Sequence, residues 1–221
     1  MGKIDIKIYI KAAFFTPIVF SVGMGIGIYL DSLRISFFAS KFEEFQIDFS
    51  NLILEEMFFK SILAEENRLC SIYNEKTTKL AEKAGKLGSY LESLREATKL
   101  KSYEFEILKQ KYFLSNLQLW LHMIGLREKC NYNVTTILFF YTSLSKCDDC
   151  IAQGIILSRL KKRNPDYYMI FAVDVDSKLG IVSTLKQYFN ITQVPAVVIN
   201  ENIKLEGFHS EERLRKYIEK G

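Results

Sequence analysis

The chain has 221 residues, a formal net charge of +4 and 25% charged side chains. A charge this mild excludes a strongly basic, nucleic-acid-binding surface as the basis of function. The sequence also contains no glycine-rich phosphate loop, no metal-ligand cluster and no nucleophilic serine motif. We therefore expect no metal, no other cofactor and no nucleic-acid partner. The length accommodates a membrane anchor, a helical segment and one small domain.

An uncharged segment lies near the N-terminus, at residues 12–30. As a helix, a run of this length spans a bilayer core of roughly 30 Å. A secretory signal peptide is the alternative, because the run follows a basic N-terminus. The run is long for such a signal, however, and no clean small-x-small cleavage site follows it. We therefore predict a short basic N-terminus and an uncleaved transmembrane anchor over residues 1–31.

The charges that flank this segment predict its orientation. Lys3, Lys7 and Lys11 precede it, whereas Arg34 and Lys41 follow it. Because basic residues gather on the cytoplasmic side of a membrane segment, we expect the N-terminus to be cytoplasmic. The rest of a single-pass protein of the cell membrane then lies outside the cytoplasm. The four cysteines agree with this placement, since disulfides persist in oxidising compartments.

The pattern of residues 32–129 predicts a helical stalk or bundle. No proline occurs between Pro17 and Pro165, and apolar residues recur at helical spacing. Breaks are expected near residues 70–74 and 99–102, which would make the three helices antiparallel neighbours. Sustained heptads are absent, so a long coiled coil is the lesser option.

The motif Cys147-Asp148-Asp149-Cys150 follows an apolar, strand-like run at residues 134–141 and opens a helix-like run. A Cys-x-x-Cys pair at the start of a helix is typical of a dithiol redox site. Unpaired backbone N–H groups and the helix dipole favour a thiolate at the first cysteine. The motif therefore predicts thiol–disulfide chemistry.

The remaining pattern predicts the order β-α-β-α-β-β-α for the C-terminal part. The dithiol helix is followed by a strand, a second helix, two strands joined by a hairpin and a last helix. The expected ranges are residues 167–175, 179–189, 197–200, 203–206 and a helix that starts at Ser210.

This order and three motifs resemble the core of the thioredoxin family over residues 131–221. The motifs are the CDDC pair, the turn at residues 191–196 and Gly207 after the last strand. The resemblance implies that Pro195 is cis and lies against the dithiol, and that the backbone of Val194 binds an extended substrate. We accordingly predict a thioredoxin-like α/β domain over residues 130–221. As a whole the chain is similar to membrane-anchored thioredoxin-domain proteins of an archaeal type.

The chain departs from the family pattern at several positions. Lys146 replaces the usual tryptophan before the first cysteine, and Tyr141 replaces the usual buried acid of the preceding strand. Asp148 and Asp149 suit the first turn of a helix but repel a neighbouring thiolate. The proton acceptor for Cys150 is therefore left unidentified.

Cys70 and Cys130 lie outside the dithiol motif. Each is expected to end a helix, and outside the cytoplasm we expect them to form one structural disulfide. A pair of reduced core cysteines is the alternative. A zinc site is a poor third interpretation, because His122 and His209 are not at ligand spacing.

Two functions remain open at this point. In the first, Cys147 attacks disulfides of protein substrates and Cys150 resolves the mixed disulfide. In the second, the domain is a non-catalytic binding module and the Cys147–Cys150 bridge is static. The dithiol with its proline favours the first, and the missing acid and tryptophan favour the second.

Overall fold

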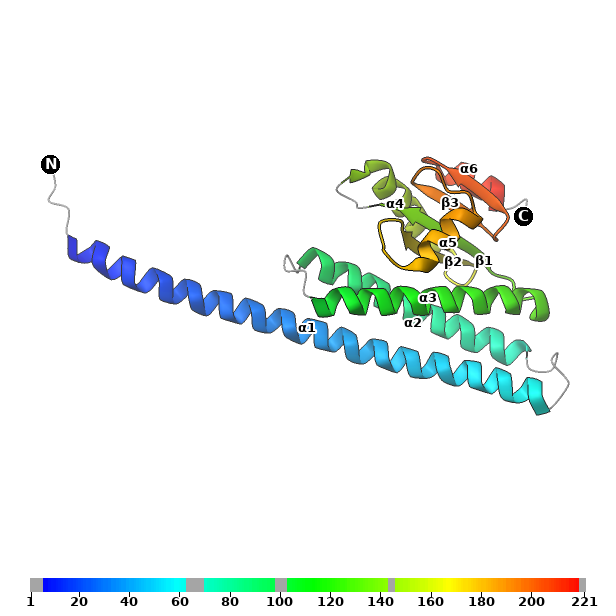
Figure 1. Cartoon of the computed structure of the whole chain (residues 1–221), viewed down its shortest axis with the longest axis horizontal. Coiled ribbons are helices and arrows are strands. Elements are labelled where there is room, and N and C mark those ends of the chain that lie inside the picture. The colour runs from blue at the N-terminus through cyan, green and yellow to red at the C-terminus, as the bar shows by residue number, and fades with distance from the viewer. Residues whose placement is uncertain (1–5, 63–69, 98–102, 143–145, 219–221) are drawn as a thin grey trace.

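A computed structural model describes residues 6–62, 70–97, 103–142 and 146–218. It is a mixed α/β structure in which these residues form six helices and a four-stranded sheet (Figure 1). The elements are α1 (Ile6–Ile62), α2 (Cys70–Ala97), α3 (Tyr103–Cys130), β1 (Thr135–Tyr141), α4 (Asp148–Arg163), β2 (Tyr168–Asp174), α5 (Gly180–Tyr188), β3 (Ala196–Ile199), β4 (Ile203–Glu206) and α6 (Glu211–Ile218).

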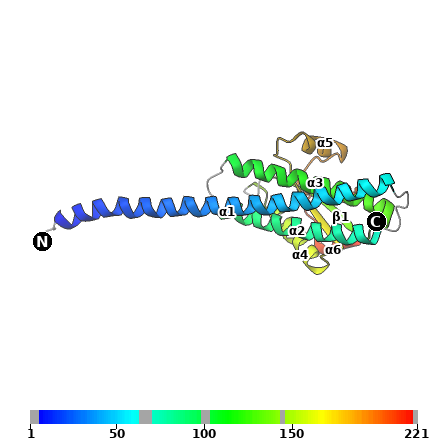
Figure 2. The same ribbon diagram turned by 90° about the horizontal axis from the view of Figure 1, so that it is seen from below.

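Helix α1 is continuous over 57 residues, so the predicted boundary at residues 31–32 falls inside one helix. Its first half projects beyond the rest of the molecule (Figures 1 and 2). The large apolar side chains of this half are exposed. This half is long and apolar enough to cross a membrane, and its most apolar window is not buried. The second half buries a stripe at three- and four-residue spacing: Phe38, Phe42, Phe45, Phe49 and Leu52.

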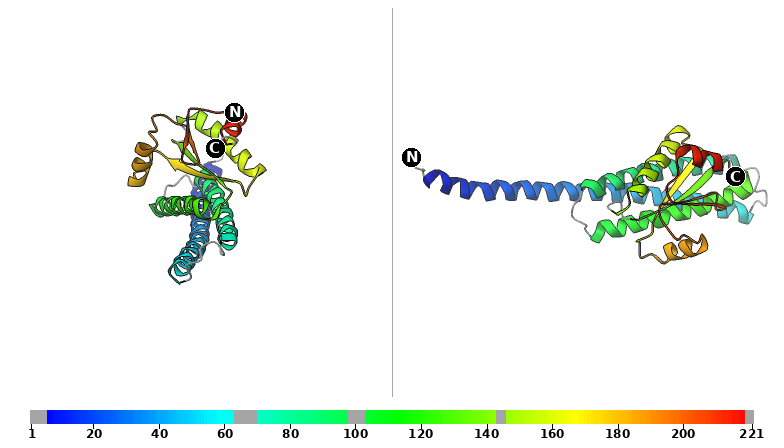
Figure 3. Two further views of the ribbon diagram at one scale, coloured as in Figure 1. Left: turned by 90° about the vertical axis from the view of Figure 1, so that its right-hand side faces the viewer. Right: turned by 90° about the horizontal axis from the view of Figure 1, so that it is seen from above.

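Helices α2 and α3 pack along the second half of α1 (Figures 1 and 3). The predicted break at residues 70–74 is wrong, because α2 begins at Cys70. Tyr73 and Thr77 are both buried, so the apolar contact of α2 continues into its first turn and keeps that turn helical. Cys70 therefore begins a helix, whereas Cys130 ends one, as predicted. The other expected break, residues 99–102, lies outside the described residues.

The sheet has the order β2-β1-β3-β4. Strand β1 pairs parallel with β2 and antiparallel with β3, and β3 pairs antiparallel with β4. The predicted order of strands and helices in this part of the chain is confirmed. Strand β1 is buried over all but its last residue because both faces of the sheet are covered.

The two faces belong to different apolar clusters. Helices α4 and α6 cover one face, where Leu157 and Leu214 contact Ile137 and Val197. Helix α5 and the helical bundle cover the other face. There the bundle and the sheet share one continuous core, so the sheet is not a separate body on a flexible tether.

Polar contacts hold the sheet against α3 at two places, and we call this contact region the junction. At the start of β1, Glu201 of the β3–β4 turn accepts hydrogen bonds from Trp120 Nε1 (2.9 Å) and Thr136 Oγ1 (2.6 Å). The same carboxylate pairs with Arg127 of α3. At the other end of the strands, Lys109 of α3 lies 3.4 Å from Asp174, the last residue of β2.

Candidate dithiol site

The dithiol lies at the N-terminus of α4. Cys147 is the N-cap residue, and its Sγ accepts the backbone N–H of Cys150 at 3.1 Å. The N–H groups of this first turn have no partners within the helix, so sulfur at the cap is well placed to carry negative charge. The structure holds Cys147 and Cys150 as a disulfide.

The two cysteines differ in exposure. Cys147 is partly exposed, whereas Cys150 is 1% exposed and belongs to the core of the α4 face. An incoming disulfide can therefore reach Cys147, but Cys150 can react only with a sulfur already bonded to Cys147. Asp148 and Asp149 are both exposed in the first turn of α4.

The Val194–Pro195 segment lies at the same end of the sheet as the dithiol. Ala196 pairs with Phe140, so Pro195 comes beside the end of β1, from which the chain continues to Cys147. Val194 and Cys147 both pack against the cluster that contains Cys150. The peptide bond between Val194 and Pro195 is cis.

Two residues at the end of β4 hold this proline loop. The carboxylate of Glu206 accepts the backbone N–H of Thr192 at 2.6 Å and that of Gln193 at 3.4 Å. The next residue, Gly207, donates its N–H to the carbonyl of Pro195 at 2.8 Å and has a φ of 82°, which favours glycine. The hydrogen bond from the Thr192 N–H is the main reason why the pKa of Glu206 lies below its ordinary value of 4.5.

A buried polar pair that the sequence analysis missed lies one turn along α4 from Cys150. Gln153 is 0% exposed, and its Oε1 accepts the backbone N–H of His209 at 2.8 Å. His209, in the loop before α6, is 7% exposed, and its Nε2 lies 3.1 Å from the carbonyl of Glu206. Gln153 could have been noticed as a polar residue on the apolar face of α4, beside Leu157 and Leu160.

Tyr141 occupies the place that an acid was expected to fill. It is partly exposed, stacks on Phe139 with ring centroids 5.6 Å apart, and packs against the cluster of Cys150. The last residue of β1 therefore brings an aromatic ring, and no carboxylate, to the cluster of Cys150.

A second disulfide joins Cys70 to Cys130, 60 residues apart. It links the start of α2 to the end of α3, far along the bundle from the apolar half of α1. It therefore closes the α2–α3 hairpin at the point where the chain leaves the bundle for the sheet.

Polar side chains also contact one another between the helices of the bundle. His122 lies between Glu56 and Thr77, at 3.2 Å from each. Within the described ranges no group of three or more His, Cys, Asp or Glu residues is arranged to hold a metal ion.

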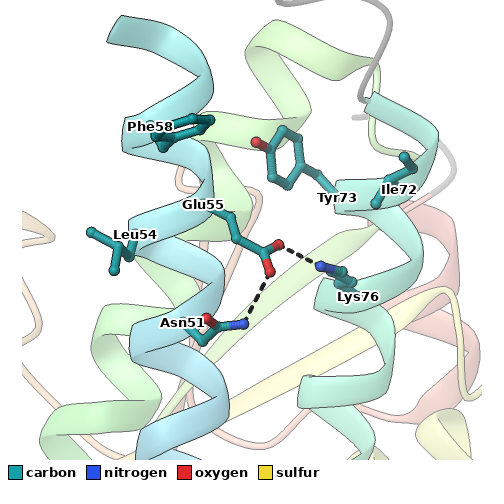
Figure 4. A pocket seen from close by; sticks show the side chains of 7 residues that line it. All are labelled: Asn51, Leu54, Glu55, Phe58, Ile72, Tyr73 and Lys76. Carbon is teal, nitrogen blue, oxygen red and sulfur yellow. Dashed lines mark hydrogen bonds and ion pairs between the residues drawn. The ribbon is translucent and has the colours of Figure 1, made fainter. Parts of the chain in front are cut away.

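A cavity of about 470 Å³ lies between α1 and α2, away from the dithiol (Figure 4). Glu55 crosses it to pair with Lys76 and accepts the side-chain N–H of Asn51 at 3.0 Å. Its lining comprises Asn51, Leu54, Glu55, Phe58, Ile72, Tyr73 and Lys76.

No family model and no curated protein matches the chain. Solved structures that it resembles include thioredoxin-2 of the malaria parasite, described as a component of the parasite's protein secretion machinery. That match has 22% identity and a TM-score of 0.35, and covers 40% of this chain and 84% of that one. A second, described as a malarial protein, has 22% identity and a TM-score of 0.34, and covers 40% of this chain and 97% of that one. At TM-scores this low, the two matches carry no argument about this chain beyond the geometry described above.

Proposed function

We propose that this chain is a membrane-anchored thiol–disulfide oxidoreductase with a thioredoxin-like domain. The observation that carries the proposal is the unequal pair at the start of α4. Cys147 caps the helix and is reachable, whereas Cys150 is buried beside it. The position of the Val194–Pro195 segment at the same edge of the sheet supports the proposal.

The difference in exposure between Cys147 and Cys150 sets the order of the two reaction steps. The Cys147 thiolate attacks one sulfur of a substrate disulfide, and the other substrate sulfur leaves as a thiolate. The buried Cys150 thiol then loses its proton and attacks Cys147. This second attack forms the Cys147–Cys150 disulfide and releases the first substrate sulfur, so the substrate gains two electrons and the protein loses two. The backbone of Val194 pairs with the extended substrate beside the dithiol.

Exchange with a glutathione buffer tests this function. We expect the reduced and oxidised forms of the full-length protein to interconvert, and the Cys150→Ser variant to accumulate a mixed disulfide at Cys147. The competing function is a non-catalytic binding module, which Tyr141 at the expected acid position favours. A Cys147–Cys150 bridge that never exchanges in the folded protein would support this module and refute the enzyme.

We further propose that α1 is a single-pass anchor with its N-terminus in the cytoplasm and the dithiol outside. Support comes from the exposed apolar half of α1 and the three lysines before it. The test is labelling of the reduced dithiol by a membrane-impermeant thiol reagent on intact cells. Labelling only after lysis would contradict the external placement.

A further inference from the structure

We infer that the dithiol acts on a partner embedded in the same membrane, whose cysteines lie at the bilayer surface. The inference rests on the proposed function and adds the class of its substrate. It comes from two observations. The bundle holds the sheet so that the dithiol faces the apolar half of α1, and, measured along α1, the dithiol lies a short way beyond the end of that half.

The direction follows from the contacts between α3 and the sheet. The start of β1 lies at Arg127, whose guanidinium donates to Thr136 Oγ1 at 3.3 Å. The other end of the strands lies at Lys109, which contacts Asp174, and Asp174 pairs with Tyr141 at the end of β1. Strand β1 therefore runs against α3, from the far end of the bundle toward the start of α3.

Helices α1 and α3 run in the same direction, away from the apolar half of α1 (Figure 1). The end of β1 therefore points back toward that half. The dithiol follows the end of β1, and in Figure 1 the start of α4 lies at the end of the sheet that faces the N-terminal half of α1. If α1 crosses a bilayer, the dithiol faces that bilayer.

Contacts between α3 and α1 give the height of the dithiol above the end of the apolar run, measured along α1. The ring of Tyr112 lies 6.2 Å from the rings of Phe38 and Phe42. Lys109 lies one turn closer to the membrane than Tyr112, and Asp31 is the first charged residue after the apolar run. At a rise of about 1.5 Å per residue, Phe38 is about 10 Å from Asp31 along the helix. Measured along the axis of α1, the edge of the sheet that carries the dithiol thus lies on the order of 10 Å beyond the end of the apolar run.

The attachment is too rigid for the site to reach far from this height. The bundle and the sheet share one core, and the Glu201 cluster and the Lys109–Asp174 pair fix both ends of the sheet on α3. Helix α1 continues from the apolar half into the bundle without a break. The interfacial layer of a bilayer is roughly 5–8 Å thick on each side, so the dithiol meets sulfur atoms that lie just outside that layer.

The test uses the full-length Cys150→Ser protein in phosphatidylcholine vesicles with two transmembrane helical peptides. Each peptide carries one cysteine as a mixed disulfide with 5-thio-2-nitrobenzoate. In the surface probe the cysteine lies about 10 Å beyond the apolar segment, at the height of the dithiol, and in the raised probe it lies about 30 Å further out, both on a stiff helix. Attack by Cys147 on the peptide sulfur forms the Cys147–peptide disulfide and releases coloured thionitrobenzoate, which gives the rate.

We expect the surface probe to react about tenfold faster than the raised probe, because the fixed height sets the local concentration of cysteine. A helical insert of eighteen residues between Leu30 and Asp31 makes five full turns and raises the dithiol by about 27 Å without rotating it. This insert variant should prefer the raised probe. Both proteins should react equally with soluble glutathione–thionitrobenzoate, which controls for folding.

Equal rates with the two probes would overturn the inference, as would a preference that the insert leaves unchanged. In those cases reaction with soluble glutathione–thionitrobenzoate would leave the proposed function standing. Absence of reaction with that soluble disulfide as well would overturn the proposed function and the inference together.

Discussion

Glu201 accepts the indole N–H of Trp120 at 2.9 Å across 81 residues of sequence. The carboxylate lies at the tip of the β3–β4 turn, where Asn200 and Glu201 both have positive φ values. Through Trp120 and Arg127 it joins the sheet to α3. The chain has one tryptophan, so its fluorescence reports on this junction.

Replacement of Glu201 by Ala should loosen the junction. The change leaves the Trp120 indole N–H without its acceptor and removes the carboxylate partner of Arg127, which keeps its hydrogen bond to Thr136 Oγ1. We expect a loss of about 2–3 kcal/mol in the free energy of unfolding. The tryptophan emission should also change in the folded state. Denaturant unfolding and fluorescence measure both effects, with Glu212→Ala on the exposed face of α6 as the control. A Glu201→Ala protein as stable as this control would contradict the prediction.

Gly88 and Gly85 of α2 should respond in opposite ways to replacement by Ala. A Cβ at Gly88 would lie 2.5 Å from the hydroxyl of Tyr112, which donates to the carbonyl of Ala84 at 2.7 Å. The half-buried ring must move and lose this bond, so we expect destabilisation of about 1–3 kcal/mol. A Cβ at Gly85 meets open space, and Ala there should stabilise the helix by up to about 1 kcal/mol. Chemical denaturation measures the change in the free energy of unfolding for each variant. Equal changes in the two variants would refute this account of the packing.

Glu206 should make stability depend on pH in the acid range. Because its pKa in the folded protein lies below its ordinary value of 4.5, the unfolded chain binds the proton more readily. The contribution of the Glu206 carboxylate to the free energy of unfolding is complete above about pH 5. It is lost as the pH falls through the lowered pKa. Glu206→Gln should cost about 1–2 kcal/mol at pH 7 and flatten the stability curve between about pH 5 and pH 3. Unfolding measured over this range, with Glu212→Gln as control, tests the prediction; parallel curves for wild type and Glu206→Gln would contradict it.

The Cys70–Cys130 bond should contribute strongly to the stability of the bundle. It closes a loop between residues 60 apart, for which the chain-entropy model gives about 4 kcal/mol. Peptide mapping without reductant should recover the Cys70–Cys130 cross-link, and the double Cys→Ser variant should unfold at a lower denaturant concentration. Free thiols at both positions in protein purified under oxidising conditions would show that the bond is absent.

Asp148 and Asp149 should make the dithiol more reducing. Both carboxylates are exposed in the turn that Cys147 caps, where they repel a thiolate and thereby destabilise the reduced form. Replacement of both by Asn should shift the potential by about 10–30 mV toward the oxidising end. Equilibration against glutathione measures the shift, and Asp166→Asn, after the other end of α4, is the control. An unchanged or more reducing double variant would show that the helix dipole and Lys146 set the potential.

The order of elements after residue 130 was predictable because its apolar runs are short, periodic and separated by turn residues. The dithiol and Pro195 were visible because their spacing is itself a motif. The contacts that hold them were not, since Gln153 and His209 are 56 residues apart and neither belongs to a motif. The continuity of α1 was hidden for a different reason. The charges from Asp31 onward end the uncharged run, but the hydrogen bonds of a helix are internal and need not break there.

The Cys70–Cys130 bond also decides what a protease can release. Helix α1 joins the bundle through the chain before Cys70, and the sheet joins it through the chain after Cys130. A single cut anywhere between these two cysteines severs the backbone but leaves α1 and the dithiol in one covalent molecule. Release of the dithiol unit from α1 by such a cut therefore requires a reductant as well as a protease.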